Sequence, residues 1–132
     1  MVAEGLTYLG KPYTHDMVTG IDCSGLAKKA LAAVGVDALR SAAQQWGDFL
    51  LRGEEIADPA SLKPGDLVFY TDIGCEDEPL CSTQNEVHHV AIYIGGGQLL
   101  EAVGYDTMTT LIRPFHSHPG SFVTLMSRVL GE

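Results

Sequence analysis

Cys23, within the stretch from Gly20 to Leu26, is the residue of this sequence with the clearest capacity for chemistry. Apolar residues recur behind it at the spacing of one helix face, namely Leu26, Ala27, Ala30, Leu31 and Val34. Cys23 is therefore predicted to open a helix that ends near Gly35. At the start of that helix, unpaired backbone N–H groups and the helix dipole would stabilise a thiolate on Cys23. The plainer interpretation is a small buried hydrophobe, as most cysteines without a disulfide are. A second reactive residue has to decide between the two.

His89 and Glu101 are the residues that could complete a catalytic set. Residues 87–94 and 98–103 are predicted to be strands joined by a tight turn at three consecutive glycines, so His89 and Glu101 fall on neighbouring strands. Glu101 interrupts an apolar strand face, and a buried carboxylate needs a hydrogen-bonding partner or solvent. Cys23, His89 and Glu101 could thus act as nucleophile, base and orienting residue. The alternative is a surface histidine and a solvated glutamate.

The elements that must position these residues follow a simple order, with helices first and consecutive strands after them. Helices are predicted at 2–9, from Cys23 to about Gly35, and from the N-cap Ser41 to Leu51, and strands at 67–70, 87–94, 98–103, 109–112 and 122–130. This order predicts an α+β fold with an antiparallel sheet rather than a doubly wound one. In the third helix, Trp46 and Leu50 are expected on the inward face.

Size and charge narrow the function classes. The 132 residues fit a single domain, 1–132, and the formal charge of −9 with no basic cluster argues against nucleic-acid binding. No apolar run is long enough to span a membrane, and the start of the chain lacks the pattern of a signal peptide. If the protein acts outside the cytoplasm, we expect export by another route, or a sequence that has been trimmed.

Cys75 and Cys81 lie close together in an acidic segment and are predicted to form a disulfide. A zinc site built from them, His88 and another ligand is disfavoured by the cysteine spacing. We predict no metal and no organic cofactor. His15 could line a cleft, although solvent exposure is the simpler expectation. The remaining histidines, His116 and His118, are expected at the surface.

Five segments of the sequence resemble the NlpC/P60 cysteine peptidases, in the order found in that family and over most of the chain. They are Tyr8–Tyr13 (YLGKPY), Asp22–Leu26 (DCSGL), Arg40–Gln45 (RSAAQQ), Leu62–Tyr70 (LKPGDLVFY) and His89–Gly95 (HVAIYIG). The resemblance implies a papain-like α+β domain, with N-terminal helices packed on an antiparallel sheet.

The same resemblance implies roles for individual residues. Cys23 would be the nucleophile and His89 the base, and the third catalytic position falls on Glu101, where the family commonly has histidine, asparagine or glutamine. Tyr13 would lie beside the oxyanion and Asp22 near the amino end of the substrate, with Ser24 also counted as substrate-binding. Two segments depart from the family pattern, Tyr13–Asp16 and the insertion-like loop at 71–86.

The resemblance implies a cysteine endopeptidase or amidase that hydrolyses peptidoglycan stem peptides at a D-glutamyl–diamino acid bond, acting at the cell wall or periplasm. The alternatives are an amidase or acyltransferase on another γ-glutamyl or lipid substrate, and an inactive wall-binding module. Wall remodelling, a phage lysin and an exported antibacterial effector all remain open. An effector would also have an inhibitor or immunity protein and delivery machinery as partners.

Overall fold

The computed structural model describes residues 1–16, 18–71, 87–103, 108–115 and 122–129. Its helices are α1 (Val2–Leu6), α2 (Cys23–Ala32) and α3 (Ala42–Arg52), with a short 3₁₀ turn, η1 (Pro59–Ser61). Its strands are β1 (Glu54–Glu55), β2 (Leu67–Thr71), β3 (Val87–Gly95), β4 (Gln98–Ala102), β5 (Thr110–Pro114) and β6 (Phe122–Arg128). Helices precede strands along the chain, as the sequence predicts.

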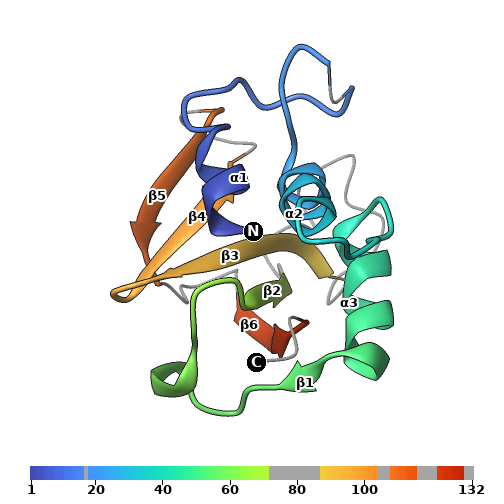
Figure 1. Ribbon diagram of the computed structural model, residues 1–132, viewed down its shortest axis with the longest axis vertical. Helices are drawn as coiled ribbons and strands as arrows, with labels where there is room; N and C mark the ends of the chain where they lie inside the picture. Colours follow the sequence, from blue (N-terminus) through green and yellow to red (C-terminus); the bar gives the residue numbers. More distant parts are fainter. Residues whose placement is uncertain (17, 72–86, 104–107, 116–121, 130–132) are drawn as a thin grey trace.

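The strands form one six-stranded sheet in the order β1-β6-β2-β3-β4-β5 (Figure 1). Every neighbouring pair runs antiparallel. The β3–β4 hairpin turns at Gly95, Gly96 and Gly97, all of which have positive φ angles (98°, 62° and 75°) that favour glycine. The predicted α+β fold with an antiparallel sheet is confirmed.

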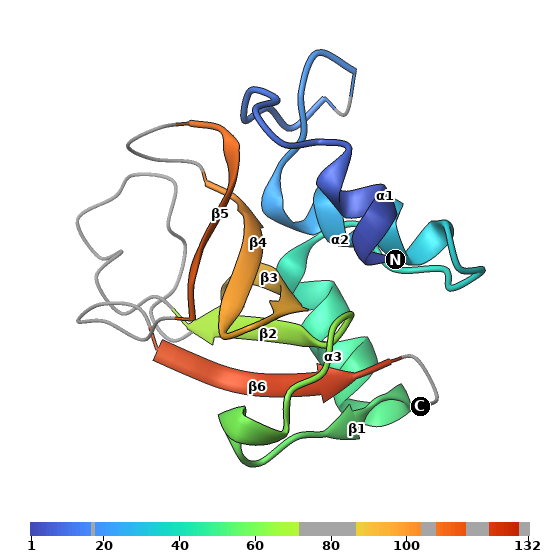
Figure 2. The same ribbon diagram turned by 60° about the vertical axis from the view of Figure 1, so that its left-hand side comes forward.

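The helices and the sheet enclose the main core. Figures 1 and 2 show α1 and α2 side by side, and α2 and α3 both contact β3. Buried residues of the helices meet one face of the sheet, including Leu26, Leu31, Phe49, Phe69, Ile92 and Leu100. A second cluster contains the alternate strand residues and is joined by Ile56 and Leu62 from the segment around η1. Side chains of β3 therefore alternate between the two clusters, with Val90 and Ile92 in the first and Ala91 in the second.

The second and third helices begin at the predicted residues. Asp22 caps α2, and Ser41 caps α3 through a reciprocal capping box with Gln44. Trp46 packs against the core as expected, but Leu50 is wrong as an inward residue because half of it (50%) is exposed.

The ends of two helices differ from the prediction. The first helix stops at Leu6 rather than at residue 9, and α2 stops at Ala32, so Val34 is 44% exposed. Gly35 follows that end with a φ of +81°. Within the described ranges, no helix has both the length and the apolar character needed to cross a membrane.

Candidate active site

Cys23 is the first residue of α2 and is 6% exposed. The residue before it, Asp22, is the helix N-cap and accepts a hydrogen bond from the backbone N–H of Gly25 at 2.7 Å. The thiol therefore lies at the helix end where backbone N–H groups and the helix dipole favour negative charge. The predicted helix start at Cys23 is confirmed, and with it the local setting that makes this cysteine a candidate nucleophile.

His89, from β3, joins Cys23 to Glu101. Its Nε2 lies 2.7 Å from Oε1 of Glu101 on β4, which leaves Nδ1 as the nitrogen available to Cys23. Burial by itself would lower the pKa of His89, but hydrogen bonds to Cys23 and Glu101 and the negative charges of both raise it to about 10. A proton held on His89 between two anions is the arrangement of a thiolate–imidazolium pair with an orienting carboxylate.

Glu101 is completely buried, with 0% of the residue exposed. Besides His89 it accepts two hydrogen bonds from Arg113 on β5, at 2.5 Å from Nε to Oε2 and at 3.1 Å from Nη2 to Oε1. The register pairs Glu101 with Leu111 and Leu99 with Arg113, so Arg113 lies diagonally across from Glu101 on the same face. Its buried setting excludes the alternative of a solvated glutamate.

Sequence reasoning missed Arg113. The predicted strand stopped at residue 112, one position short, and no partner was assigned to the carboxylate. A signal was present, because Arg113 is the only lysine or arginine between Lys63 and Arg128. A single cation at the end of the strand that pairs with β4 is the natural counterion for a buried glutamate.

Tyr13 lies half-buried beside the nucleophile. Burial raises the pKa of its hydroxyl, and the negative charges of Cys23 and Asp22 raise it further. The positive charge of Arg40 and a hydrogen bond from the backbone N–H of Cys23 act in the opposite direction. Tyr13 is therefore a protonated phenol next to the backbone amide of the candidate nucleophile, and its place beside an oxyanion stays a prediction.

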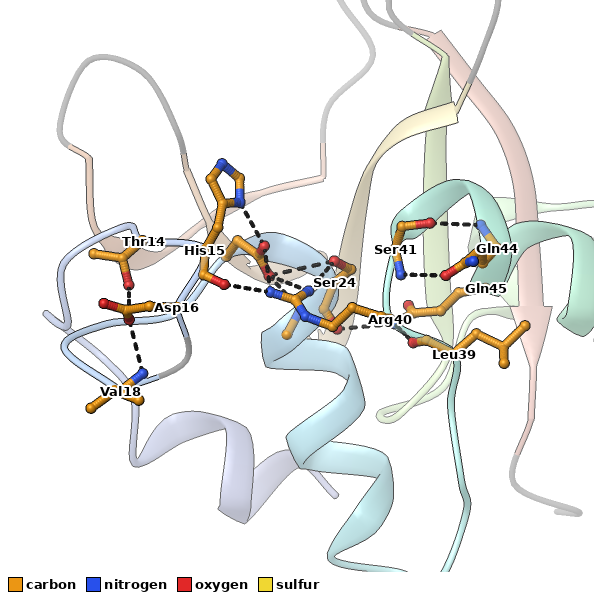
Figure 3. A network of polar contacts seen from close by, with 12 residues as sticks. Thr14, His15, Asp16, Val18, Ser24, Leu39, Arg40, Ser41, Gln44 and Gln45 are labelled. Atoms are coloured by element: carbon orange, nitrogen blue, oxygen red, sulfur yellow. Dashed lines mark hydrogen bonds and ion pairs between the residues drawn. The ribbon is translucent and has the colours of Figure 1, made fainter. Parts of the chain in front are cut away.

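Asp22, the residue before Cys23, is bonded to Arg40 and His15, which belong to the cluster of polar contacts drawn in Figure 3. Arg40 donates to both carboxylate oxygens, at 3.0 and 2.9 Å, and His15 Nδ1 lies 2.8 Å from Oδ2. Arg40 also donates to the Ser24 hydroxyl at 3.1 Å and to the backbone carbonyl of His15 at 3.0 Å. Burial would raise the pKa of Asp22, but the bonds from Arg40, His15 and Gly25 and the charge of Arg40 outweigh it and lower that pKa.

The contacts within this cluster bear on the predicted substrate-binding roles of Asp22 and Ser24. Both oxygens of Asp22 already have protein partners, so a substrate amine would have to displace one of them. His15 is the partner that can leave, because its side chain is 77% exposed whereas the carboxylate is 7% exposed. Ser24 is buried in the same cluster. Gln45 donates to the Ser24 carbonyl at 2.9 Å and so ties α3 to the start of α2.

Several sequence predictions lie outside the described residues. These are the disulfide between Cys75 and Cys81, the loop at 72–86, the surface histidines His116 and His118, and the side chain of His88. Among the residues that are described, no group of three or more His, Cys, Asp or Glu side chains could hold a metal ion.

Comparison with protein families decides the classification. The model of the NlpC/P60 family matches residues 10–121. The chain belongs to the NlpC/P60 family. This result confirms the resemblance drawn from the sequence and agrees with the geometry around Cys23.

Two curated NlpC/P60 relatives are hydrolases. Gamma-DL-glutamyl hydrolase of Bacillus subtilis is 33% identical over 113 residues, which cover 83% of this chain and 24% of that protein. Peptidoglycan endopeptidase RipB of Mycobacterium tuberculosis is 39% identical over 85 residues, which cover 64% of this chain and 28% of that protein. The chain thus spans about a quarter of the length of these relatives.

A solved NlpC/P60 structure is similar over nearly its whole length. RipD of Mycobacterium tuberculosis, described as a non-catalytic NlpC/P60 domain protein adapted to peptidoglycan binding, has a TM-score of 0.70 and 26% identity. The match covers 98% of this chain and 94% of RipD. The family therefore includes hydrolases and at least one protein that binds without catalysis, so membership alone does not settle activity.

Proposed function

We propose that this chain is a cysteine endopeptidase that hydrolyses the bond between D-glutamate and a diamino acid in peptidoglycan stem peptides. The observation that carries the proposal is the position of His89, which bonds to both Cys23 and Glu101. The hydrolase relatives support the choice of a γ-glutamyl bond in the cell wall as substrate. The site of action in this proposal is the wall or the periplasm.

The reaction follows from the residues in place. The Cys23 thiolate attacks the γ-carbonyl carbon of D-glutamate, and the developing oxyanion lies toward the Cys23 backbone N–H and the Tyr13 hydroxyl. His89 gives its proton to the departing amine, which leaves a thioester on Cys23. His89 then takes a proton from the attacking water, and the resulting hydroxide displaces the Cys23 thiolate from the thioester. The released carboxylic acid gives its proton to solvent, so the thiolate–imidazolium pair is restored.

The test is digestion of purified stem peptides that contain one γ-D-glutamyl–diamino acid bond, followed by mass spectrometry of the products. We expect the parent protein to release the two fragments and Cys23→Ala to release neither. Equal fragment yields from both proteins would overturn the role of Cys23. Absence of fragments with the parent protein would overturn the proposed substrate.

Two other functions are supported by specific relatives. Hydrolysis of a γ-linked glutamyl peptide outside the wall is favoured by the similarity to gamma-DL-glutamyl hydrolase. Peptidoglycan binding without catalysis is favoured by the similarity to RipD. Release of fragments from a γ-linked glutamyl oligomer but not from stem peptides would indicate the first. Sedimentation of the protein with insoluble wall, without any fragment released, would indicate the second.

A further inference from the structure

Among the described residues, Cys23, His89, Glu101 and Arg113 are linked in series at the candidate active site. In the thiolate–imidazolium form of Cys23 and His89 that the proposed reaction requires, the carboxylate of Glu101 and the guanidinium of Arg113 bring the sum of the four charges to zero. Without Arg113 the sum would be one net negative charge around a carboxylate that is 0% exposed. Uncompensated charge at a buried position is costly. Arg113 therefore reduces the cost of burying the charges of Cys23, His89 and Glu101.

We propose that Arg113 is a positioning residue of this site, which fixes the Glu101 carboxylate against His89 and cancels its charge. The two hydrogen bonds from Arg113 reach both carboxylate oxygens, which leaves Glu101 little freedom to rotate away from His89. Glu101 adds one negative charge beside His89, and the guanidinium of Arg113 supplies the positive charge that offsets it.

Other charged and titratable groups face this site from several elements. Tyr70 of β2 lies beside His89, with ring centroids 5.7 Å apart, and Tyr13 lies beside Cys23. Arg40 interacts electrostatically with Cys23, but its guanidinium bonds to Asp22. Among the described residues, Arg113 is bonded directly to Glu101, and its side chain is 27% exposed, so solvent screens its charge only in part.

The direction of each charge effect follows from Coulomb attraction and repulsion. The positive charge of Arg113 opposes the proton on His89, whereas the negative charge of Glu101 favours it. Arg113→Gln should therefore shift loss of the His89 proton to higher pH, and Glu101→Gln should shift it to lower pH. In the double variant neither charge remains. The pH midpoint for loss of the His89 proton should therefore lie above that in Glu101→Gln, where Arg113 still opposes the proton.

The inference rests on the proposed function only for its activity readout, so the test uses a second readout that needs no substrate. The pH at which the His89 ring loses its proton is followed by NMR in the parent, Arg113→Gln, Arg113→Lys, Glu101→Gln and the double variant. In parallel, kcat/KM is measured on the stem peptide. We expect Arg113→Gln to lower kcat/KM about tenfold, the lower end for a residue that orients a carboxylate–histidine pair. Arg113→Lys keeps the charge and should restore the NMR midpoint but only part of the rate.

Arg128→Gln is the matched control. Arg128 of β6 also makes two bonds to one buried carboxylate, with Nε 3.0 Å from Oδ1 and Nη2 2.8 Å from Oδ2 of Asp66. This variant should lower stability as Arg113→Gln does, yet leave the His89 midpoint unchanged.

A purely structural role for Arg113 makes a different set of predictions. Equal His89 midpoints in Arg113→Gln and in the parent would overturn the inference. So would equal midpoints in Glu101→Gln and the double variant, a comparison that stands even if Arg113→Gln fails to fold. If the midpoints shift as expected but the parent cleaves no stem peptide, the proposed substrate fails and the role of Arg113 stands.

Discussion

Asp22→Asn tests how far the start of α2 depends on the polar cluster beside the nucleophile. Asparagine has the size of aspartate and is an equally good N-cap, so its amide oxygen can still accept from the Gly25 N–H. The amide nitrogen, however, would face the donors of Arg40 and His15, which now lie 2.9 and 2.8 Å from Oδ2. The substitution therefore removes the charged bonds and keeps the helix cap.

The loss of unfolding free energy in Asp22→Asn can be estimated from the burial of Asp22 and Arg40. Hydrogen bonds to charged groups contribute about 1.5–3 kcal/mol each to stability. The Asp22 side chain is 7% exposed but that of Arg40 is 40% exposed, so solvent screens the pair substantially. We expect Asp22→Asn to lower the free energy of unfolding by about 2 kcal/mol, at the lower end for charged bonds. Asp22→Ala should cost about 3 kcal/mol, because the cap is lost as well.

Urea denaturation between pH 2 and pH 8 supplies the measurement. The folded structure holds the pKa of Asp22 below its ordinary value, through the bonds and charge of Arg40 and the bonds from His15 and Gly25, which outweigh the opposing effect of burial. A depressed carboxyl pKa stabilises the fold above the unfolded-state value of about 3.9, and this contribution disappears as pH falls through the folded value. The difference between the parent and Asp22→Asn should therefore be constant above about pH 5 and shrink below about pH 4.

Asp48→Asn is the control for this experiment. Asp48 also pairs with an arginine, Arg52 Nη2 at 2.7 Å, but on an exposed helix surface where both partners are open to solvent. That substitution should change stability by about 0.5 kcal/mol or less. The reasoning is refuted if Asp22→Asn costs no more than Asp48→Asn at pH 7, or if its cost does not diminish in acid.

Three further predictions concern close contacts and protonation. Gly20→Ala should destabilise the fold by about 2 kcal/mol in urea denaturation, because a Cβ would lie 2.1 Å from the Pro12 carbonyl oxygen; unchanged stability would contradict that contact. Gly47→Ala, in an open stretch of α3, should instead raise stability by about 1 kcal/mol, the helix preference of alanine over glycine. The alkaline limb of the kcat/KM profile, where activity falls with rising pH, should lie near pH 10, because His89, whose pKa is raised to about 10, must stay protonated to serve the leaving amine. A limb near pH 7 would mean that His89 does not hold its proton against Cys23.

The sequence by itself determined the features that depend on neighbours along the chain. The start of α2 at Cys23 follows from the Asp22 cap and the apolar spacing behind it, and both are local signals. The hairpin that brings His89 and Glu101 together follows from strand alternation and three glycines within 13 residues. These signals were enough to predict the three residues that the structure joins in one hydrogen-bonded set.

Tertiary structure alone decided the partners that complete the site. Arg40 reaches Asp22 across 18 residues of sequence, and the position of Arg113 depends on the register between β4 and β5. Val34 is exposed because α2 ends at Ala32, and Leu50 is exposed because another face of α3 packs against the core. A hydrophobic pattern predicts a face but not what packs on it, and a shift of one residue in register turns a side chain to the opposite face of the sheet. For that reason the nucleophile, base and orienting carboxylate could be predicted from sequence, while the bonds of Arg40 to Asp22 and of Arg113 to Glu101 were decided by packing and register.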